Sequence, residues 1–172
     1  MKKFSNKVAV ITGAASGIGL ASARAFAREG MHIVLLDNRE GVLQTARESL
    51  LKDGAKVLAL TVDVGDAVAV EKSVQRVIAE FGAVHLLMNN AAVFIRGPEI
   101  AEVQDDVWDW LLRVNLYGTL NCIRSYLPYL KKNEDEGHIV NTCSISGLSV
   151  RPRNNGVYAT SKYALVGLSE AL

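Results

Sequence analysis

Residues 8–19 read VAVITGAASGIG, an unbroken apolar run followed at once by a turn with three glycines. A short apolar run without polar alternation is typical of a strand that is buried on both faces. The glycines allow a tight turn, and the amphipathic segment 18–29 that follows predicts a helix. The stretch therefore predicts a buried strand and a helix, joined by a turn through which a ligand can approach the backbone.

The same alternation of short apolar runs and longer amphipathic segments continues to the end of the chain. Further strands are predicted at 32–36, 56–60, 85–88 and 138–142, and further helices at 41–52, 67–81, 104–131 and from 157 onward. Such an order predicts an α/β fold with a doubly wound, mostly parallel sheet. There is no linker, repeat or low-complexity segment, so residues 1–172 are predicted to form a single domain.

The composition argues against several classes of protein. Of the 172 residues, 49% are hydrophobic and the formal net charge is +1, which fits a soluble domain with a sizeable core and gives no sign of a nucleic-acid partner. No apolar stretch approaches the ~20 residues of a membrane-spanning helix, and the run after the basic start is too short for a secretory signal. Cys122 and Cys143 lie in apolar runs, and no histidine has a second ligand at metal spacing. We therefore expect a cytoplasmic protein without a disulfide or a metal site.

The glycine-rich turn has the position that a dinucleotide site needs. Because it follows a strand and opens a helix, free N–H groups and the positive end of the helix dipole would face a pyrophosphate. Its spacing differs from GxGxxG, and an ordinary glycine-rich turn is the alternative interpretation. Asp37 closes the second predicted strand, where a carboxylate can accept hydrogen bonds from an adenosine ribose and repel a 2′-phosphate. Arg39 is the one nearby cation that would hold such a phosphate, so the pattern favours NAD and leaves NADP open.

Tyr158-Ala-Thr-Ser-Lys162 places a phenol and an ammonium one helical turn apart. A phenol normally keeps its proton up to about pH 10, and a neighbouring ammonium favours the phenolate and lowers that pKa. The pair therefore predicts an acid/base group that works near neutral pH. Taken alone, a solvated helix face is the other interpretation.

Together these segments resemble the short-chain dehydrogenase/reductase family, and the resemblance covers essentially the whole chain in order. Residues 12–19 are similar to the family's cofactor motif, and residues 63–64 to the pair beside the adenine. Residues 89–92 are similar to the motif after the fourth strand, although Ala92 stands where the family usually has glycine. The resemblance implies a Rossmann-like fold that binds NAD or NADP through Gly13, Ser16, Gly17, Ile18, Gly19, Asp37, Asp63, Val64, Asn90, Ala91, Tyr158 and Lys162.

The resemblance also implies a catalytic tetrad formed by Asn115, Ser144, Tyr158 and Lys162. Tyr158 would give or take the proton of the substrate oxygen, and Lys162 would lower the pKa of Tyr158 and bind the nicotinamide ribose. Ser144 would hold the substrate oxygen, and Asn115 would hold a water in a proton relay from Lys162. Each residue also has a structural interpretation, since serine and asparagine often satisfy the backbone of a loop or helix.

The chain ends at Leu172, within the last predicted helix. Members of the family usually continue with two more strands, their helices and a loop that closes over the substrate, so the resemblance implies that the C-terminal part is missing. The strand at 138–143 would then be an exposed sheet edge. We expect part of a longer protein, with a natural short variant as the alternative.

Three functions remain open on these grounds. The first is an NAD(P)-dependent oxidoreductase that transfers a hydride between the cofactor and an alcohol/carbonyl substrate, in a homodimer or homotetramer. Its substrate contacts are expected from residues 92–99 and 145–155, where apolar side chains indicate a partly apolar site. The second is a nucleotide-binding module with little turnover. The third is an interaction protein whose candidate contact residues are Trp108, Leu111, Leu112 and Tyr163.

Overall fold

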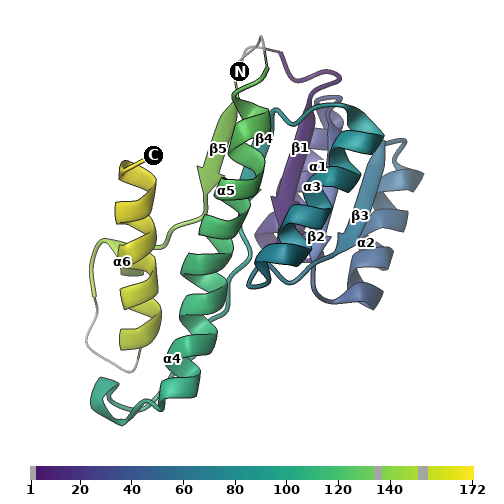
Figure 1. Cartoon of the computed structure of the whole chain (residues 1–172). Coiled ribbons are helices and arrows are strands. Elements are labelled where there is room, and N and C mark those ends of the chain that lie inside the picture. Colours follow the sequence, from purple (N-terminus) through teal and green to yellow (C-terminus); the bar gives the residue numbers. More distant parts are fainter. Residues whose placement is uncertain (1–2, 134–136, 151–154) are drawn as a thin grey trace.

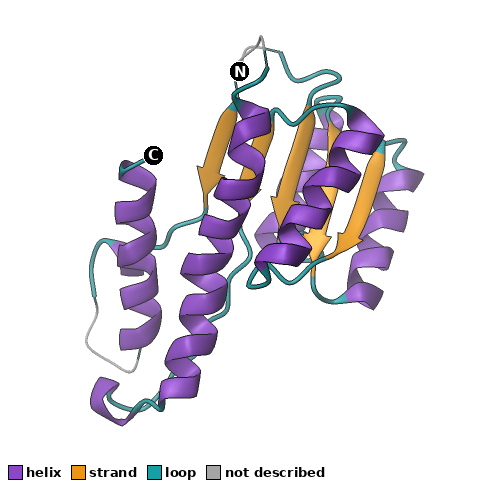
Figure 2. Cartoon of the chain, in the orientation of Figure 1, coloured by secondary structure: helices purple, strands orange, loops and turns teal. Residues whose placement is uncertain are grey.

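A parallel sheet of five strands forms the centre of the computed structural model, which describes residues 3–133, 137–150 and 155–172 (Figures 1 and 2). The strand order is β3-β2-β1-β4-β5, and every neighbouring pair is parallel. The doubly wound α/β fold expected from the sequence is therefore confirmed. The strands are β1 (Val8–Thr12), β2 (His32–Asp37), β3 (Val57–Thr61), β4 (Leu86–Asn89) and β5 (His138–Asn141).

Helices cover both faces of this sheet. α1 (Gly17–Arg28) and α2 (Glu40–Lys52) pack on one face, and α3 (Ala67–Phe81) and α5 (Gly118–Leu130) pack on the other. Each face has its own apolar core, so the sheet separates two hydrophobic layers. Apart from the helix predicted at 104–131, the predicted bounds lie within one residue of the observed ones.

The central strand β1 shows why its sequence lacks polar alternation. Val8 and Val10 lie in the core shared with α3 and α5, while Ala9 and Ile11 lie in the core shared with α1 and α2. None of the four is more than 1% exposed. A strand that is buried on both faces needs apolar residues at every position, and residues 8–11 provide them.

The helix predicted at 104–131 is interrupted, which corrects the expectation of one regular helix. α4 (Asp105–Leu112) is followed by a π-helical turn, η2 (Arg113–Tyr117), and then by α5 along the same line (Figure 1). A π turn accommodates an extra residue and is frequent at functional sites. This turn carries the buried residue Asn115. One inserted residue leaves the 3.6-residue apolar period nearly unchanged, so the turn could not be predicted from periodicity.

The sheet ends at β5, which pairs only with β4 among the described residues. α6 (Gly156–Glu170) packs chiefly beside α4, η2 and the short turn η3 (Ile145–Gly147). Val140 in β5 is 42% exposed, so the expected exposed edge is confirmed. No helix in the described part of the chain is long and apolar enough to cross a membrane.

Candidate functional site

The turn after β1 requires glycine at the predicted positions. Gly13 and Gly17 have φ values of 61° and 54°, in the left-handed region where a side chain would strain the backbone. A Cβ on Gly19 would collide with the carbonyl oxygen of Gly13 and lie 2.8 Å from Nδ2 of Asn90. Beyond Gly17, by contrast, a Cβ would meet no atom within 4 Å. The N-terminus of α1, with its free N–H groups, therefore faces open space, which fits a bound pyrophosphate.

The segment after β4 holds this turn in place. The Thr12 hydroxyl accepts hydrogen bonds from the backbone N–H groups of Asn90 and Ala91, at 2.9 and 3.0 Å. The Asn90 side chain donates to the carbonyl oxygens of Thr12 and Gly13, at 3.1 and 3.3 Å. Thus the ends of β1 and β4 form one rigid floor, as expected where parallel strands end side by side.

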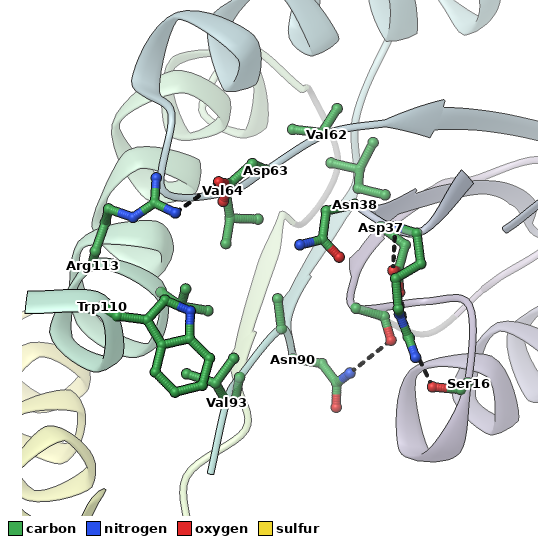
Figure 3. A pocket seen from close by; sticks show the side chains of 16 residues that line it. Ser16, Asp37, Asn38, Val62, Asp63, Val64, Asn90, Val93, Trp110 and Arg113 are labelled. Carbon is green, nitrogen blue, oxygen red and sulfur yellow. Dashed lines mark hydrogen bonds and ion pairs between the residues drawn. The ribbon is translucent and has the colours of Figure 1, made fainter. Parts of the chain in front are cut away.

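A cavity of about 480 Å³ opens over this floor (Figure 3). Its volume lies in the range of small-molecule and cofactor sites, roughly 300–1,000 Å³. It extends from the end of β2 to the loop after β4 and to η2. The lining residues are Gly13, Ser16, Leu36, Asp37, Asn38, Arg39, Val62, Asp63, Val64, Asn90, Ala91, Ala92, Val93, Trp110, Arg113 and Val114.

Most of the predicted cofactor residues meet at this cavity. Gly17 and Gly19 shape the turn without lining the cavity, and Ile18 is 63% exposed. Tyr158 and Lys162 do not line it either, so the residues predicted to bind the nucleotide and those predicted to be catalytic lie at two places, which we call the nucleotide end and the catalytic end. The predicted residues that do line the cavity are Gly13, Ser16, Asp37, Asp63, Val64, Asn90 and Ala91.

Asp37 is buried and forms an ion pair with Arg39. Its Oδ1 accepts from Nε of Arg39 at 3.0 Å, and its Oδ2 accepts from Nη2 at 3.0 Å. Burial alone would raise the pKa of Asp37, but hydrogen bonds from Arg39 and from the backbone N–H of Ala15 outweigh it, and the pKa is lowered. The same Nη2 donates to the Ser16 hydroxyl at 2.9 Å. Sequence reasoning identified both Asp37 and Arg39 but missed their pairing.

A second arginine lies across the same cavity, in η2. Arg113 contacts Asp63 through Nη2 and Oδ2 at 3.0 Å, with both side chains partly exposed. Oδ1 of Asp63 accepts from the backbone N–H of Gly65, so Asp63 also fixes the turn after β3. Neither Arg113 nor its neighbour Trp110 belongs to a predicted motif, so neither was expected at the site.

At the catalytic end, Tyr158 and Lys162 lie one turn apart in α6, as predicted. The Nζ of Lys162 lies 5.8 Å from the centroid of the Tyr158 ring. Lys162 is only 2% exposed and donates to the carbonyl oxygen of Thr142 at 2.8 Å. Burial lowers the pKa of Lys162, although Cys143 acts in the opposite direction. The Tyr158 ring packs edge-on against Phe94, with ring centroids 4.9 Å apart.

Asn115 connects the loop after β4 to α6. Its Oδ1 accepts from the Val93 N–H at 2.8 Å, and its Nδ2 donates to the Val93 carbonyl at 2.9 Å. The same Nδ2 donates to the Ser161 hydroxyl at 3.1 Å, and Ser161 donates in turn to the Tyr158 carbonyl at 2.7 Å. Both ends of the Asn115 amide are thus engaged, and its backbone carbonyl accepts from the Thr119 hydroxyl at 3.4 Å. Sequence reasoning missed Ser161, whose position inside the Tyr158–Lys162 segment was its only signal.

Ser144 begins the turn η3, which packs against α6. Its hydroxyl oxygen accepts from the backbone N–H of Ser146 at 3.2 Å, so it supports its own loop while its O–H remains a donor. A Cβ on Gly147 would lie 2.7 Å from the Lys162 carbonyl oxygen, so glycine permits the close approach of η3 to α6. Residues 151–154, part of the segment expected to contact substrate, lie outside the described residues.

Comparisons with known proteins match nearly the whole chain. A family model for short chain dehydrogenase matches residues 7–172. Meso-2,3-butanediol dehydrogenase of Serratia marcescens is 38% identical over 99% of this chain and 65% of that enzyme. 3beta-hydroxysteroid dehydrogenase 2 of Eggerthella lenta is 36% identical over 97% of this chain and 64% of that enzyme. A solved short chain dehydrogenase/reductase from Burkholderia phymatum in complex with NAD has a TM-score of 0.95 and 39% identity, over 99% of this chain and 60% of that one.

The chain thus spans 60–65% of the length of these three relatives. The family match includes the glycine turn, the cavity and the Tyr158–Lys162 segment. Both named relatives are dehydrogenases, and the Burkholderia protein binds NAD. Since the family model covers residues 7–172, the chain belongs to the short-chain dehydrogenase family.

Proposed function

We propose that this chain is the cofactor-binding and catalytic part of an NAD-dependent oxidoreductase that interconverts an alcohol and a carbonyl compound. The observation that carries the proposal is the buried Lys162 ammonium, one helical turn from Tyr158 and 5.8 Å from its ring. A buried cation beside a phenol favours the phenolate, the form that a general base needs.

The proton steps fall to Tyr158 and Lys162. In the oxidation direction, Tyr158 takes the proton of the alcohol hydroxyl; in the reduction direction, it gives a proton to the carbonyl oxygen. The cofactor, when bound, accepts or supplies the hydride. Lys162 stabilises the phenolate electrostatically, and the Thr142 carbonyl fixes the position of its ammonium.

Positioning falls to Ser144 and Asn115. The Ser144 O–H, held at the start of η3, orients the substrate oxygen near Tyr158. Asn115 keeps the loop after β4 in contact with α6 through Val93 and Ser161. In a proton relay from Lys162 to solvent, Asn115 would hold a water at the π turn.

NAD is the cofactor we propose, with NADP as the weaker alternative. The turn at Gly13–Gly19 would hold the pyrophosphate, Asp37 the adenosine ribose, and Asp63–Val64 with Asn90–Ala91 the adenine side of the cavity. The lowered pKa of Asp37 keeps its carboxylate charged, which repels a 2′-phosphate. The Burkholderia relative in complex with NAD supports this choice.

The substrate is proposed to be an alcohol of partly apolar character. Around the catalytic end, Phe94 is 57% exposed, Ile145 72% and Leu148 70%, and together they offer an apolar surface. The relatives named above act on a vicinal diol and on a steroid, according to their names. We propose that residues beyond Leu172 complete this pocket in the whole protein and that copies associate as a dimer or tetramer.

A nucleotide-binding module with little turnover is the second candidate, favoured by one observation. Described residues line a cavity of about 480 Å³ at the nucleotide end, whereas Ile145 and Leu148 at the catalytic end are 72% and 70% exposed. The 172-residue chain would then bind NAD and need further residues for catalysis.

The test is NADH formation with a panel of secondary alcohols, measured by absorbance. We expect turnover in a form that includes the C-terminal part, and a loss of about 10²–10⁴-fold in Tyr158→Phe with a much smaller change in NAD affinity. NAD binding without turnover in any form would support the second candidate. Failure to bind NAD at all would contradict both.

A further inference from the structure

We infer that Arg39 is a specificity-determining residue that competes with the ligand's ribose for Asp37. The inference rests on the proposed function, since the ligand is taken to be an adenosine nucleotide with a ribose diol. Arg39 would lower the affinity for NAD and reduce the discrimination between NAD and NADP.

The carboxylate of Asp37 already accepts four hydrogen bonds. Oδ1 accepts from the backbone N–H and from Nε of Arg39, at 3.1 and 3.0 Å. Oδ2 accepts from the Ala15 N–H at 3.1 Å and from Nη2 of Arg39 at 3.0 Å. A carboxylate has about four acceptor positions, two on each oxygen. All four are therefore in use, and a ribose can bond to Asp37 only after a donor leaves.

Of the donors to Asp37, the guanidinium of Arg39 is the one that can leave. The backbone N–H groups of Ala15 and Arg39 are fixed by the turn after β1 and by the chain after β2. The guanidinium is different, because the Arg39 side chain is 52% exposed while that of Asp37 is 3% exposed. Because the guanidinium is half-exposed, it can swing into solvent, and the ribose hydroxyls would replace its two hydrogen bonds to the buried carboxylate.

The Arg39 guanidinium and the ribose of the ligand would make the same number of hydrogen bonds to Asp37. The guanidinium donates one hydrogen bond to each carboxylate oxygen, in the bidentate form typical of arginine. A ribose 2′,3′-diol also offers two O–H donors, one for each oxygen. Nη2 also donates to the Ser16 hydroxyl at 2.9 Å, which holds the guanidinium over Asp37. NAD must therefore displace the Arg39 fork, and the cost of displacement reduces its affinity.

The 2′-phosphate of NADP behaves differently. A phosphate at this position supplies no 2′-O–H to Asp37, and it gains from a nearby guanidinium. Loss of Arg39 should therefore strengthen NAD binding and weaken NADP binding. These opposite signs distinguish competition from a general effect of charge, because removing a cation near two anionic ligands would weaken both.

The experiment is calorimetric titration of the 172-residue chain with AMP, 2′-deoxy-AMP, NAD⁺ and NADP⁺. AMP is included because it uses only the nucleotide end. For Arg39→Ala we expect AMP and NAD⁺ to bind about two- to fivefold more tightly, the ratio that corresponds to an ion pair with one half-exposed partner. The gain should be smaller for 2′-deoxy-AMP, which has one donor fewer, and NADP⁺ should bind more weakly. Arg39→Gln, which cannot form the fork, should give an intermediate gain.

Arg113→Ala is the matched control, because Arg113 lines the same cavity, is 49% exposed and pairs with a different carboxylate. It removes the same charge and should not tighten AMP binding. Equal or weaker binding of AMP and NAD⁺ by both Arg39 variants would overturn the inference while leaving the proposed function intact. No binding of any nucleotide by the wild-type chain would overturn the proposed function as well.

Discussion

The nucleotide end and the catalytic end of the site are built in different ways. The nucleotide end depends on backbone conformation, with glycines of positive φ and strand ends bonded through Thr12 and Asn90. The catalytic end depends on side chains from separate elements, joined through Asn115 and Ser161 at the edge of the sheet. Its apolar residues Ile145 and Leu148 are more than two-thirds exposed. The difference indicates that nucleotide binding and catalysis can be lost independently.

The largest expected effect is a loss of turnover at the catalytic end that leaves the nucleotide end intact. Lys162→Met removes the buried ammonium beside Tyr158, so turnover should fall by about 10²–10⁴-fold, as for other losses of acid/base catalysis. AMP affinity should stay within twofold of wild type, about 0.4 kcal/mol, because Lys162 does not line the cavity. The measurements are initial rates with an alcohol and a calorimetric AMP titration. A comparable fall in AMP affinity would show that the two ends are not separable.

The next largest expected effect is a loss of AMP binding caused by a substitution at the nucleotide end. A methyl group at position 19 collides with Gly13 and Asn90, so Gly19→Ala should cost about 1–3 kcal/mol through displaced backbone and weaken AMP binding accordingly. Gly41→Ala is the control, since it lies in α2 with no atom within 4 Å of the added carbon. That variant should bind AMP normally and be slightly more stable, because alanine favours helix. AMP titration and thermal unfolding of the two variants provide the comparison. Unaltered AMP binding in Gly19→Ala would contradict the role of this glycine in nucleotide binding.

A smaller effect concerns the connection between the ends. Ser161→Ala removes the hydrogen bonds to Asn115 and to the Tyr158 carbonyl, a loss of about 0.5–1.5 kcal/mol. Because this contact positions Tyr158, we expect a severalfold lower kcat with unchanged AMP affinity. Ser169→Ala is matched, since Ser169 lies in the same helix and bonds to Leu165 and Asn141 instead. Equal effects of the two variants on kcat, at equal losses of stability, would assign Ser161 a purely structural role.

The smallest effect is a difference in pH dependence. The pKa of Asp37 is lowered in the folded protein, so its stabilising contribution is present above the ordinary carboxyl pKa and is lost as the pH falls through the lowered value. The pKa of Lys162 is also lowered, so stability should rise as the pH increases from that lowered value toward the ordinary lysine pKa. The free energy of unfolding, measured with urea across pH, should depend less on pH in each variant. Asp37→Asn should reduce the dependence only on the acid side, and Lys162→Met only on the alkaline side. If one variant reduced the pH dependence on both sides, the assignment of the acid side to Asp37 and the alkaline side to Lys162 would be contradicted.

The fold was predictable from sequence because its signals are local. Apolar runs such as 8–11 and 32–36 mark strands that are buried on both faces, and glycines 13 and 17 mark a turn that only glycine adopts without strain. Tyr158 and Lys162 were recognisable because a spacing of four residues is fixed by helix geometry.

The contacts between distant segments were not predictable in this way. The π turn around Asn115 differs from a regular helix by one inserted residue, which leaves the apolar period almost unchanged. The Asn115–Ser161 bond joins residues 46 apart, and the Arg113–Asp63 pair joins residues 50 apart. Such contacts depend on how complete elements pack, and periodicity within one element carries no record of them. The Asp37–Arg39 pair is local in sequence, but hydrogen bonds from Ala15 to Asp37 and from Arg39 to Ser16, 22 and 23 residues apart, also hold it.

The most direct test of the division into two ends is a calorimetric titration of the 172-residue chain with NAD⁺, repeated for Tyr158→Phe and Gly19→Ala. We predict one binding site per chain in wild type, a clear loss of affinity in Gly19→Ala, and a much smaller loss in Tyr158→Phe, because Tyr158 does not line the cavity. Absence of NAD⁺ binding in wild type, or an equal loss in both variants, would contradict the division.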